Sequence, residues 1–340
     1  MPIITERNEV LEVYAKAAEK KWVIPCFCTE NLTTTEAILS AAREFAEDRG
    51  MKRIPVTLAM TLRYPHRSQA TNYTHSRNWE TGLRLFKESA QILMREGGDY
   101  GCVDLLLHLD HVQPDLDREF CESDLSGYST IMYDASNASL EENIRSTREF
   151  VEKKGREIVI EGACDEIVDA GGEVHNEITT AEKCANYKKQ TGVDLVVANL
   201  GTEHRASGKD LRYHQTAAKA IKSMIGAKIV LHGTSSVTNE QIKDLFEDGI
   251  CKVNIWTALE RDSTPRLMEW MVKSVSKAAG IKTAEKLYQE GYLTEKCLTG
   301  EKEALSVFTT TARQELVFQE MKRIVRAYLD MWYTDREELH

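Results

Sequence analysis

The chain has 340 residues, of which 42% are hydrophobic and 29% charged, an ordinary composition for a soluble globular protein. Its formal net charge of −10 argues against a nucleic-acid-binding protein, which would normally show a basic face. No run of about 18 apolar residues occurs, so we expect no membrane span, and the charged N-terminus lacks a signal-peptide core. The eight cysteines are scattered without a C-x-x-C pair, which is typical of reduced thiols in a cytoplasmic protein.

Short apolar or β-branched runs recur along the chain, each followed by polar residues and then a helical pattern. They occupy residues 22–28, 54–60, 103–110, 129–134, 156–163, 193–200, 228–233 and 250–256. Strands that alternate with helices in this number predict a closed parallel (β/α)8 barrel of the TIM type. A doubly wound open sheet is the alternative, but it usually carries a glycine-rich loop after its first strand, and "PCFCTENLTTTE" contains no glycine.

The C-terminal part of the chain is predicted to be helical. Its final helix carries an apolar stripe at i, i+3, i+4 spacing, formed by Met321, Ile324, Val325, Tyr328, Leu329 and Trp332. We expect this stripe to pack on the chain's own barrel, with a subunit interface as the alternative. Since the chain has only six prolines and no low-complexity stretch, we expect one domain, with the barrel at about 22–260 and a helical extension at about 261–340.

Three histidines stand near the carboxyl ends of predicted strands, where barrels of this type carry their chemistry. His111 follows the third strand, His204 follows the sixth, and His232 closes the seventh. A single histidine there is more often a hydrogen-bonded surface or core residue. Three from separate strands can instead converge on one metal ion and leave a position open, as in a catalytic zinc site.

Two further side chains in "LHLDH" bear on such a site. Asp110 precedes His111 and could exchange a proton with a substrate hydroxyl, or it could only orient a ligand imidazole. His108 lies two residues before Asp110 and therefore shares its face of the strand. We expect His108 to contact Asp110 or a ligand from the outer shell of the site rather than to bind the metal ion itself.

Five sequence blocks, all at predicted strand ends, resemble the class II metal-dependent ketose-bisphosphate aldolases, the fructose- and tagatose-bisphosphate enzymes. The blocks are "LHLDH" (107–111), "MYDAS" (132–136), "GVDLVVANLGTEH" (192–204), "VLHGTSS" (230–236) and "KVNIWT" (252–257). The resemblance implies reversible retro-aldol cleavage of a ketose phosphate or related sugar derivative, through an enediolate that zinc stabilises. It implies one zinc ion per chain, held by His111, His204 and His232, with Asp110 as the acid/base.

The same resemblance extends to the substrate pocket. Gly233 and Ser235 match positions that cradle the ketone's phosphate, and Asn254 and Thr257 match residues that bind the enediolate and that phosphate. The "HGTSS" run could instead be a plain turn in which a serine caps the next helix. The resemblance further implies a monovalent cation, a phosphorylated or acidic sugar substrate, and a homodimer or larger homo-oligomer in carbohydrate metabolism.

Lysine-based aldol chemistry is disfavoured by position. Lys228 and Lys252 begin predicted strands, so we expect them at the end of the barrel opposite to the site.

Several positions depart from the family pattern. Arg205 stands where the family usually has glycine, and Trp256 replaces a small or acidic residue. Ala163 replaces a glutamate that is an alternative metal ligand, and Cys28 replaces an asparagine. Since Arg205 offers a planar fork for a carboxylate or a repositioned phosphate, we expect an active aldolase whose preferred substrate is not fructose 1,6-bisphosphate.

Two loops add charged groups. "DAGGEVHNE" matches the family's mobile loop, but Val174 takes the place of the usual base, so Glu173 and His175 are both candidates for moving the ketone's α-proton. The loop after the second strand carries a cationic cluster, Arg63, His66, Arg67 and Arg77. This cluster could meet an anionic substrate, although a solvated loop is the commoner explanation.

Two rival functions remain on the same fold. One is a non-catalytic aldolase-like companion subunit, which a lost metal ligand would indicate, and none is lost here. The other is a different single-zinc barrel enzyme. Hydrolases of that kind usually gather several carboxylates as ligands, and Ala163 removes one of these.

Overall fold

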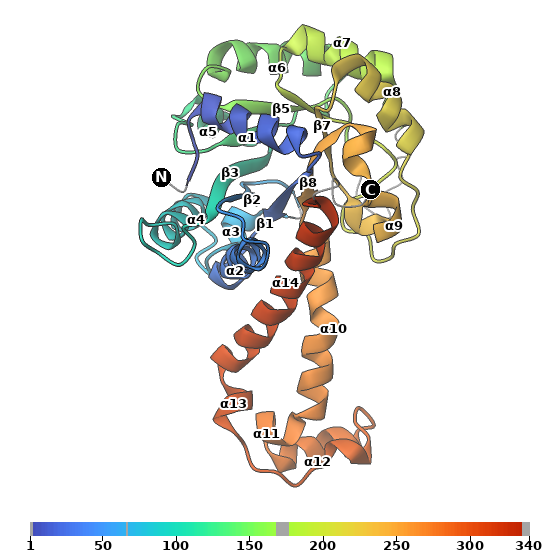
Figure 1. Cartoon of the computed structure of the whole chain (residues 1–340). Coiled ribbons are helices and arrows are strands. Elements are labelled where there is room, and N and C mark those ends of the chain that lie inside the picture. The colour runs from blue at the N-terminus through green and yellow to red at the C-terminus, as the bar shows by residue number, and fades with distance from the viewer. Residues whose placement is uncertain (1–2, 66, 168–176, 335–340) are drawn as a thin grey trace.

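The computed structural model describes residues 3–65, 67–167 and 177–334, and its strands form a closed barrel in the order β1 to β8 (Figure 1). Every neighbouring pair of strands is parallel, including β1 with β8. The strands are β1 (Ile24–Cys28), β2 (Ile54–Thr61), β3 (Val103–Val112), β4 (Thr130–Tyr133), β5 (Val159–Ala163), β6 (Leu195–Val197), β7 (Ile229–Leu231) and β8 (Ile250–Ile255). The predicted (β/α)8 barrel is confirmed.

Helices and short helical turns follow the strands and cover the barrel. They are α2 (Leu32–Asp48), α3 (Gln69–Asn72), α4 (Trp79–Leu93), α5 (Arg118–Glu122), α6 (Leu140–Lys154), α7 (Ala181–Thr191), α8 (Gln215–Ile225), η1 (Thr234–Ser236), α9 (Asn239–Ile242) and η2 (Leu245–Asp248). Polar side chains begin several of them: Asn31 accepts a hydrogen bond from the Thr34 amide (3.0 Å) and Asn78 one from the Thr81 amide (2.7 Å). These caps satisfy backbone amides in the first turn of each helix, which have no partner within the helix itself.

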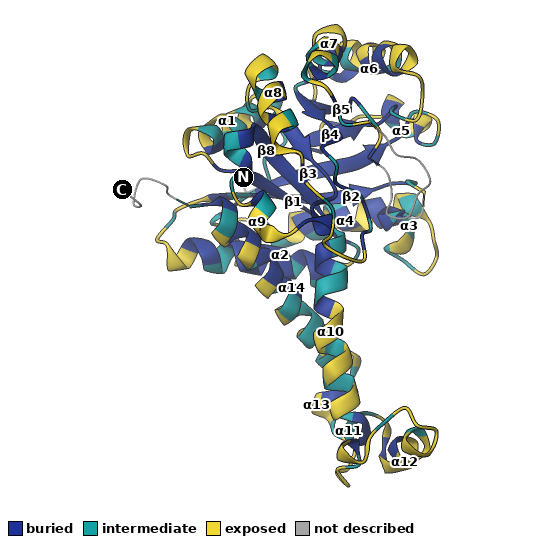
Figure 2. Cartoon of the chain, turned by 90° about the vertical axis from the view of Figure 1, so that its right-hand side faces the viewer, coloured by how far each residue is buried: buried dark blue, intermediate teal, exposed yellow. Residues whose placement is uncertain are grey.

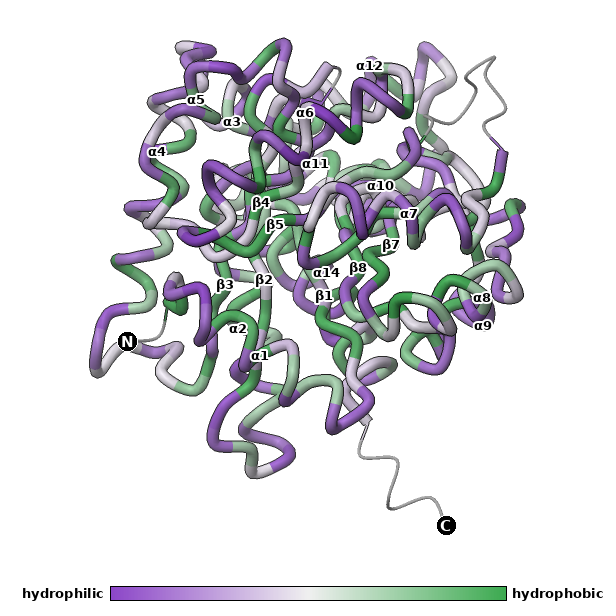
Figure 3. Tube along the Cα trace, turned by 90° about the horizontal axis from the view of Figure 1, so that it is seen from above, coloured by the Kyte–Doolittle hydropathy of each residue, from purple (hydrophilic) through white to green (hydrophobic). Residues whose placement is uncertain are grey.

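The helix α1 (Arg7–Glu19) covers the end of the barrel at which the strands begin. Its Val10 packs with Leu106 and Val159, whose side chains point into the barrel. Viewed from above, hydrophobic residues concentrate on the strands and on the inner faces of the helices (Figure 3). With this end filled, the opposite end of the barrel, where the strands finish, is left to form a pocket.

The C-terminal helices form an arm that leaves the barrel and returns to it (Figure 1). α10 (Thr257–Lys273) runs outward, α11 (Val275–Ala279), α12 (Ile281–Gln289), η3 (Glu295–Cys297) and α13 (Leu305–Phe308) lie at the far end, and α14 (Thr310–Trp332) runs back. The helical extension therefore begins at Thr257, directly after β8. The outer part of the arm is largely exposed (Figure 2).

The returning helix α14 is fixed to the barrel by the stripe that the sequence predicts. All six stripe residues are buried, the Trp332 indole donates to the Ile242 carbonyl (2.8 Å), and the Tyr328 ring lies 6.2 Å from the ring of Phe27 on β1. The expectation that α14 packs on its own barrel is confirmed. Within the described residues, no helix is both long and apolar enough to cross a membrane.

Candidate metal centre and active site

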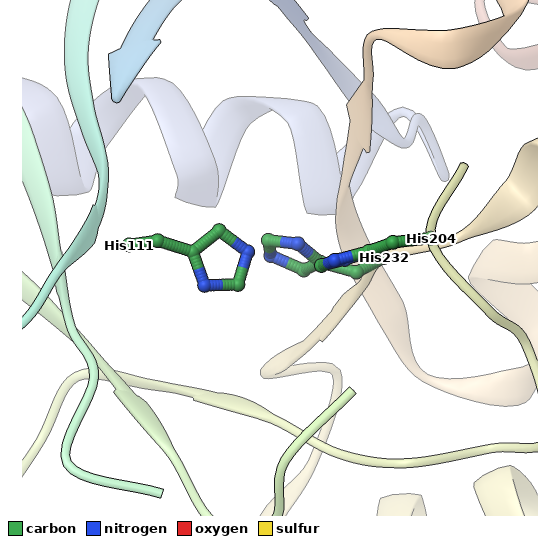
Figure 4. Close-up of side chains that lie close together, drawn as sticks. All are labelled: His111, His204 and His232. Carbon is green, nitrogen blue, oxygen red and sulfur yellow. The ribbon is translucent and has the colours of Figure 1, made fainter. Parts of the chain in front are cut away.

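Three imidazole rings from β3, the β6 loop and the end of β7 meet at the carboxyl end of the barrel (Figure 4). The ring centroids of His111 and His204 lie 5.1 Å apart, those of His111 and His232 5.0 Å, and those of His204 and His232 5.4 Å. One nitrogen from each ring lies within 4.8 Å of the other two. In the described ranges, no other trio of histidine, cysteine or carboxylate side chains meets this criterion for a metal site.

His111 reaches this position through an irregularity in β3. The sequence placed it after the strand, but β3 continues to Val112, with a register shift against β4 between Leu109 and Val112. His111 has a φ of +47°, in the left-handed region, which re-aims its side chain as in a β-bulge. Such a bulge cannot be read from an apolar run, so the predicted strand end was wrong.

Asp134 fixes the orientation of the His111 ring. Its Oδ2 lies 2.7 Å from His111 Nδ1, and its Oδ1 accepts hydrogen bonds from the amide (3.2 Å) and hydroxyl (2.6 Å) of Ser136. Burial favours the neutral carboxyl, but the hydrogen bond and charge of His111 lower the pKa of Asp134 below its ordinary value. A carboxylate on Nδ1 leaves Nε2 free to bind a metal ion. The block "MYDAS" contained this residue, yet its role was missed.

Buried ring nitrogens in this cluster have no partner in the described part of the chain. They are Nε2 of His111, Nε2 of His232 and both nitrogens of His204. Burial is the main reason that the pKa values of His204 and His232 fall well below their ordinary value, so both rings are neutral. Unprotonated imidazole is the metal-binding form. Orphaned nitrogens on convergent rings, with His204 and His232 in the neutral form, fit a bound metal ion well.

Asp110 lies beside the three histidines with both carboxylate oxygens engaged. Oδ1 accepts a hydrogen bond from the Asn254 amide (2.8 Å), and Oδ2 accepts one from Arg67 Nη2 (3.1 Å). Burial alone would raise the pKa of Asp110, but the charges and hydrogen bonds around it, His111 foremost, hold it well below its ordinary value. Asp110 is therefore an ionised group able to accept a proton.

A second polar cluster lies beneath Asp110 inside the barrel. Lys252 Nζ contacts Glu161 Oε1 at 2.6 Å, and His108 Nε2 lies 3.6 Å from Asp110 Oδ1 and 3.8 Å from Glu161 Oε2. His108 Nδ1 is 2.6 Å from the hydroxyl of Thr130. The expected position of His108 behind Asp110 is confirmed.

The expected place of Lys252 at the start of a strand is wrong. It lies inside β8, is fully buried, and ion-pairs with Glu161. Burial alone would lower the pKa of Lys252, but neighbouring negative groups, Glu161 among them, raise it above its ordinary value. A lysine kept charged in this way is a poor nucleophile, so lysine-based aldol chemistry stays disfavoured for a different reason from the one we expected.

The turn after β7 places backbone groups at the same pocket. Gly233 has a φ of +69°, and a Cβ there would lie 2.8 Å from the backbone of Glu203. Ser236 stabilises the turn by donating to the Gly233 carbonyl (2.7 Å) and accepting from the Glu203 amide (3.1 Å). Ser235 is buried beside it, so the predicted phosphate-binding pair lies next to His232.

The pocket wall brings together most of the other predicted residues. It is lined by Cys28, Arg67, His204, His232, Gly233, Thr234, Ser235, Asn254, Ile255, Trp256, Thr257 and Ala258. Arg205 follows His204 with a φ of +55° and is outside this lining. Ala163 lies buried at the end of β5. Glu173 and His175 fall outside the described residues.

The charged side chains of the loop after β2 have different surroundings. Arg63 pairs with Asp117 (3.0 Å) and Arg77 contacts Asn72 at the surface, so these two have local partners. Arg67 is instead buried in the pocket wall. The preference for a solvated loop was therefore wrong for Arg67, and His66 lies outside the described residues.

Comparisons with known proteins indicate the family of this chain. A family model described as "Fructose-bisphosphate aldolase class-II" matches residues 8–325. A fructose-bisphosphate aldolase of Streptococcus pneumoniae is 30% identical over 72% of this chain and 78% of its own, and a 6-phospho-5-dehydro-2-deoxy-D-gluconate aldolase of Bacillus licheniformis is 27% identical over 72% and 77%. The crystal structure of fructose-bisphosphate aldolase from Campylobacter jejuni superposes with a TM-score of 0.74 at 17% identity, covering 97% of this chain and 95% of that one.

Proposed function

Since the chain belongs to the class II fructose-bisphosphate aldolase family and is a metal-dependent aldolase, we propose that it cleaves a phosphorylated or acidic ketose at a single zinc ion held by His111, His204 and His232. The observation that carries this proposal is the set of unpartnered, buried nitrogens that converge from the three rings. Zinc binds imidazole and forms four-coordinate sites, so three histidines leave one position open. When bound, the ion would act as a Lewis acid that stabilises the negative charge of the enediolate.

We assign the proton transfers to residues of the chain. In the cleavage direction, the ionised Asp110 takes the proton from the substrate hydroxyl as that carbon becomes the aldehyde carbonyl. The electron pair of the breaking carbon–carbon bond stays with the ketone fragment, which then takes a proton at its α-carbon from Glu173 or His175. Asn254, through its hydrogen bond to Asp110, keeps the carboxylate aimed at the substrate.

We assign the ketone's phosphate to the turn after β7. The left-handed Gly233 and the buried Ser235 place backbone amides and a hydroxyl beside His232, an arrangement suited to an anion. Thr257 at the start of α10 faces the same pocket. We place a monovalent cation near this phosphate only by family resemblance. Trp256 lines the pocket, and Arg205 follows the ligand His204 just outside this lining. A relative from Bacillus licheniformis is named for a phosphorylated gluconate derivative, which supports an acidic sugar as a candidate substrate.

A panel assay tests this proposal. The purified protein is assayed for cleavage of fructose 1,6-bisphosphate, other ketose 1-phosphates and acid-sugar derivatives, with and without chelator. We expect activity that chelation removes and zinc restores, with fructose 1,6-bisphosphate not the preferred substrate. Preferential turnover of fructose 1,6-bisphosphate would contradict the substrate assignment, and activity unaffected by chelation would contradict the metal.

Asp110→Asn tests the proton-transfer role. We expect kcat to fall by about 10²- to 10⁴-fold, the usual contribution of a general acid/base, with one zinc ion per chain retained. Asp115→Asn, an exposed carboxylate shortly after β3, is the matched control and leaves kcat unchanged. Full activity in Asp110→Asn would remove the role.

We further propose that the chain is a single domain and forms a homodimer or larger homo-oligomer in the cytoplasm. The free cysteines agree with a reducing compartment, and α14 ties the arm to the barrel. The arm exposes large apolar side chains, Met268 (56%), Tyr292 (76%) and Leu305 (71%), of the kind that subunit interfaces bury. Light scattering after size-exclusion chromatography tests this: we expect an oligomer that Leu305→Glu weakens, and a monomer at all concentrations would contradict it.

A further inference from the structure

Arg67 is a buried cation in the wall of the active-site pocket. Only 6% of its surface is exposed, and it lines the same pocket as His204, His232 and Asn254. Taking a guanidinium out of water is costly, so its placement needs a compensating interaction or a function. Asp110 supplies one interaction, at 3.1 Å from Arg67 Nη2.

The loop that carries Arg67 is closed by its own hydrogen bonds. The Thr61 hydroxyl donates to the Arg67 carbonyl, and the Thr61 amide donates to the Gln69 side chain (2.8 Å). The Gln69 amide returns a bond to the Thr61 hydroxyl (3.0 Å), and the Arg67 amide donates to the Tyr64 carbonyl (3.2 Å). These bonds tie the backbone of Arg67 to the end of β2, so the side chain starts from a fixed point of the barrel rim.

Aromatic rings hold the guanidinium near the three histidines. Its Cζ lies 5.5 Å from the ring centroid of Tyr64 and 5.5 Å from that of Trp256. The Tyr64 ring in turn stacks on His111, with centroids 4.3 Å apart. Contacts of this kind favour a cation over the ring faces. Trp256, which departs from the family pattern, thus forms part of the same wall as Arg67.

The contact with Asp110 indicates which half of the substrate Arg67 faces. Under the proposed function, Asp110 exchanges a proton with the oxygen that becomes the aldehyde carbonyl, so this oxygen must come within hydrogen-bond reach of the carboxylate. A side chain 3.1 Å from Asp110 borders the aldehyde fragment. The ketone's phosphate is assigned elsewhere, to the turn at Gly233 and Ser235.

We propose that Arg67 is a specificity-determining residue that binds an anionic group, carboxylate or phosphate, on the aldehyde fragment of the substrate. This inference rests on the proposed function. A guanidinium presents paired N–H donors that match both anions and is more weakly hydrated than an ammonium, which suits a buried site. The alternative is that Arg67 has no contact with substrate and only balances the charge of Asp110 and orients its carboxylate.

Three aldehydes of similar size distinguish these explanations in the condensation direction, with dihydroxyacetone phosphate as donor. Glyceraldehyde is neutral, tartronate semialdehyde replaces its terminal alcohol with a carboxylate, and glyceraldehyde 3-phosphate carries a phosphate. For the unaltered zinc-loaded protein, we expect kcat/KM for at least one anionic aldehyde to exceed that for glyceraldehyde by about 10- to 100-fold, the range for a charged hydrogen-bonded pair. The anionic aldehyde with the higher kcat/KM shows whether Arg67 binds a carboxylate or a phosphate.

Substitutions then assign the preference to Arg67. In Arg67→Met, we expect the ratio between anionic and neutral aldehydes to fall to near one, mainly through KM for the anionic substrate. Arg67→Lys keeps the charge without the fork and should retain a reduced ratio. Arg63→Met, on the same loop but paired with Asp117, is the control and keeps the full ratio.

Two results would overturn the proposal. One is an unaltered protein that turns over all three aldehydes equally, a measurement that needs no variant and no assumption about folding. The other is an Arg67→Met protein that loses activity on all three in equal proportion, which would assign Arg67 to orienting Asp110. Absence of condensation with any aldehyde would instead count against the proposed function itself.

Discussion

Two polar clusters lie one beneath the other inside the same barrel, and they differ in how far their groups find partners within the chain. In the lower cluster, Lys252 pairs with Glu161, and His108 lies between Thr130, Glu161 and Asp110. In the upper cluster, the nitrogens of His111, His204 and His232 that face one another have no partner among the described residues. Both clusters are buried equally well, so burial alone does not distinguish them.

The difference gives a criterion for telling buried polar groups that stabilise the fold from those that bind a ligand. Buried polar groups are normally satisfied, because an unpaired one costs free energy. The lower cluster meets this requirement mainly within the chain, through the Lys252–Glu161 pair and the contact of His108 with Thr130. His108 Nε2 and Glu161 Oε2 make no hydrogen bond among the described residues, but each lies near an oppositely charged or titratable group of the chain. In the upper cluster, unpartnered nitrogens from all three rings converge on one point, and a ligand that the rings share is the simplest way to satisfy them. The comparison predicts opposite consequences for substitutions made only a few ångströms apart.

Removing an upper-cluster ring should have the largest effect. For His232→Ala, we expect zinc content to fall well below one ion per chain and kcat/KM to fall by about 10³-fold or more, roughly 4 kcal/mol. Elemental analysis and a cleavage assay measure both. His75→Ala, an exposed histidine, serves as control. Because the buried His232 ring also packs against His111 and His204, its removal costs packing even without metal. The comparison therefore predicts that zinc stabilises the unaltered protein much more than it stabilises His232→Ala, and equal stabilisation of the two by zinc would argue against it.

Breaking the lower cluster should act on stability instead. In Lys252→Met, Glu161 is left charged and buried, which typically costs about 3–5 kcal/mol. Urea unfolding of the zinc-loaded protein measures this loss. We expect the double variant Lys252→Met/Glu161→Gln to recover much of it, and the folded fraction of either protein to bind zinc. Lys252→Met with unchanged stability but no zinc would assign the lysine to the metal centre.

Asp134 connects the chain to the upper cluster. It has partners of its own, and through Nδ1 it orients the His111 ring, whose Nε2 has no partner among the described residues. Asp134→Asn should weaken zinc binding by about 10- to 100-fold, as is typical when the partner of a ligand histidine is lost. Competition with a chelator of known affinity provides the measurement. Ser136→Ala removes only a hydrogen bond to Asp134, and its effect should be smaller. An equal effect of the two variants would show that the His111 orientation does not depend on the Asp134 charge.

Glu260 extends the comparison to a carboxylate that is not part of the converging set of His111, His204 and His232. It lies in the first turn of α10, and its Oε1 is buried with no partner in the described ranges. Burial, with a smaller contribution from Glu30, raises the pKa of Glu260 from 4.5 to about 7. Because the folded state binds the proton more tightly, this group contributes stability below pH about 4.5, and the contribution is lost as the pH rises through about 7.

Glu260→Gln tests the sign of this effect. At pH 8 we expect the variant to be more stable than the unaltered chain by about 1–3 kcal/mol, whereas near pH 4 the two should be similar. Urea unfolding at the two pH values gives the difference. A variant that is less stable at pH 8 would mean that the charged carboxylate has a partner outside the described residues.

The barrel could be predicted because the spacing of apolar residues along the chain indicates which residues are buried in strands and helices. Eight apolar runs with helices between them left few alternatives, and the stripe on α14 was correct residue by residue. Strand ends were less accurate: β3 runs past Asp110 because a bulge extends it, and β6 and β7 have only three residues each. Bulges depend on pairing between strands, which a linear pattern does not contain.

The site was partly predictable for a similar reason. The three histidines could be named because each follows an apolar run, and their convergence follows from the barrel. Asp134 and Arg67 could not be assigned by position alone, because their roles depend on contacts across the pocket with His111 and Asp110. Lys252 was placed at the wrong depth, because it was treated as a residue that begins a strand although it lies two residues inside β8, whose predicted start at Ile250 was correct. Contacts between distant segments are the information that the sequence lacked.

Anomalous diffraction from crystals grown with zinc tests the metal centre most directly. Data collected on both sides of the zinc absorption edge should show one strong peak per chain, within about 2.0–2.1 Å of one nitrogen of each of His111, His204 and His232. A peak at another place in the barrel would contradict the assignment. So would its absence from the three rings in zinc-loaded crystals that retain cleavage activity.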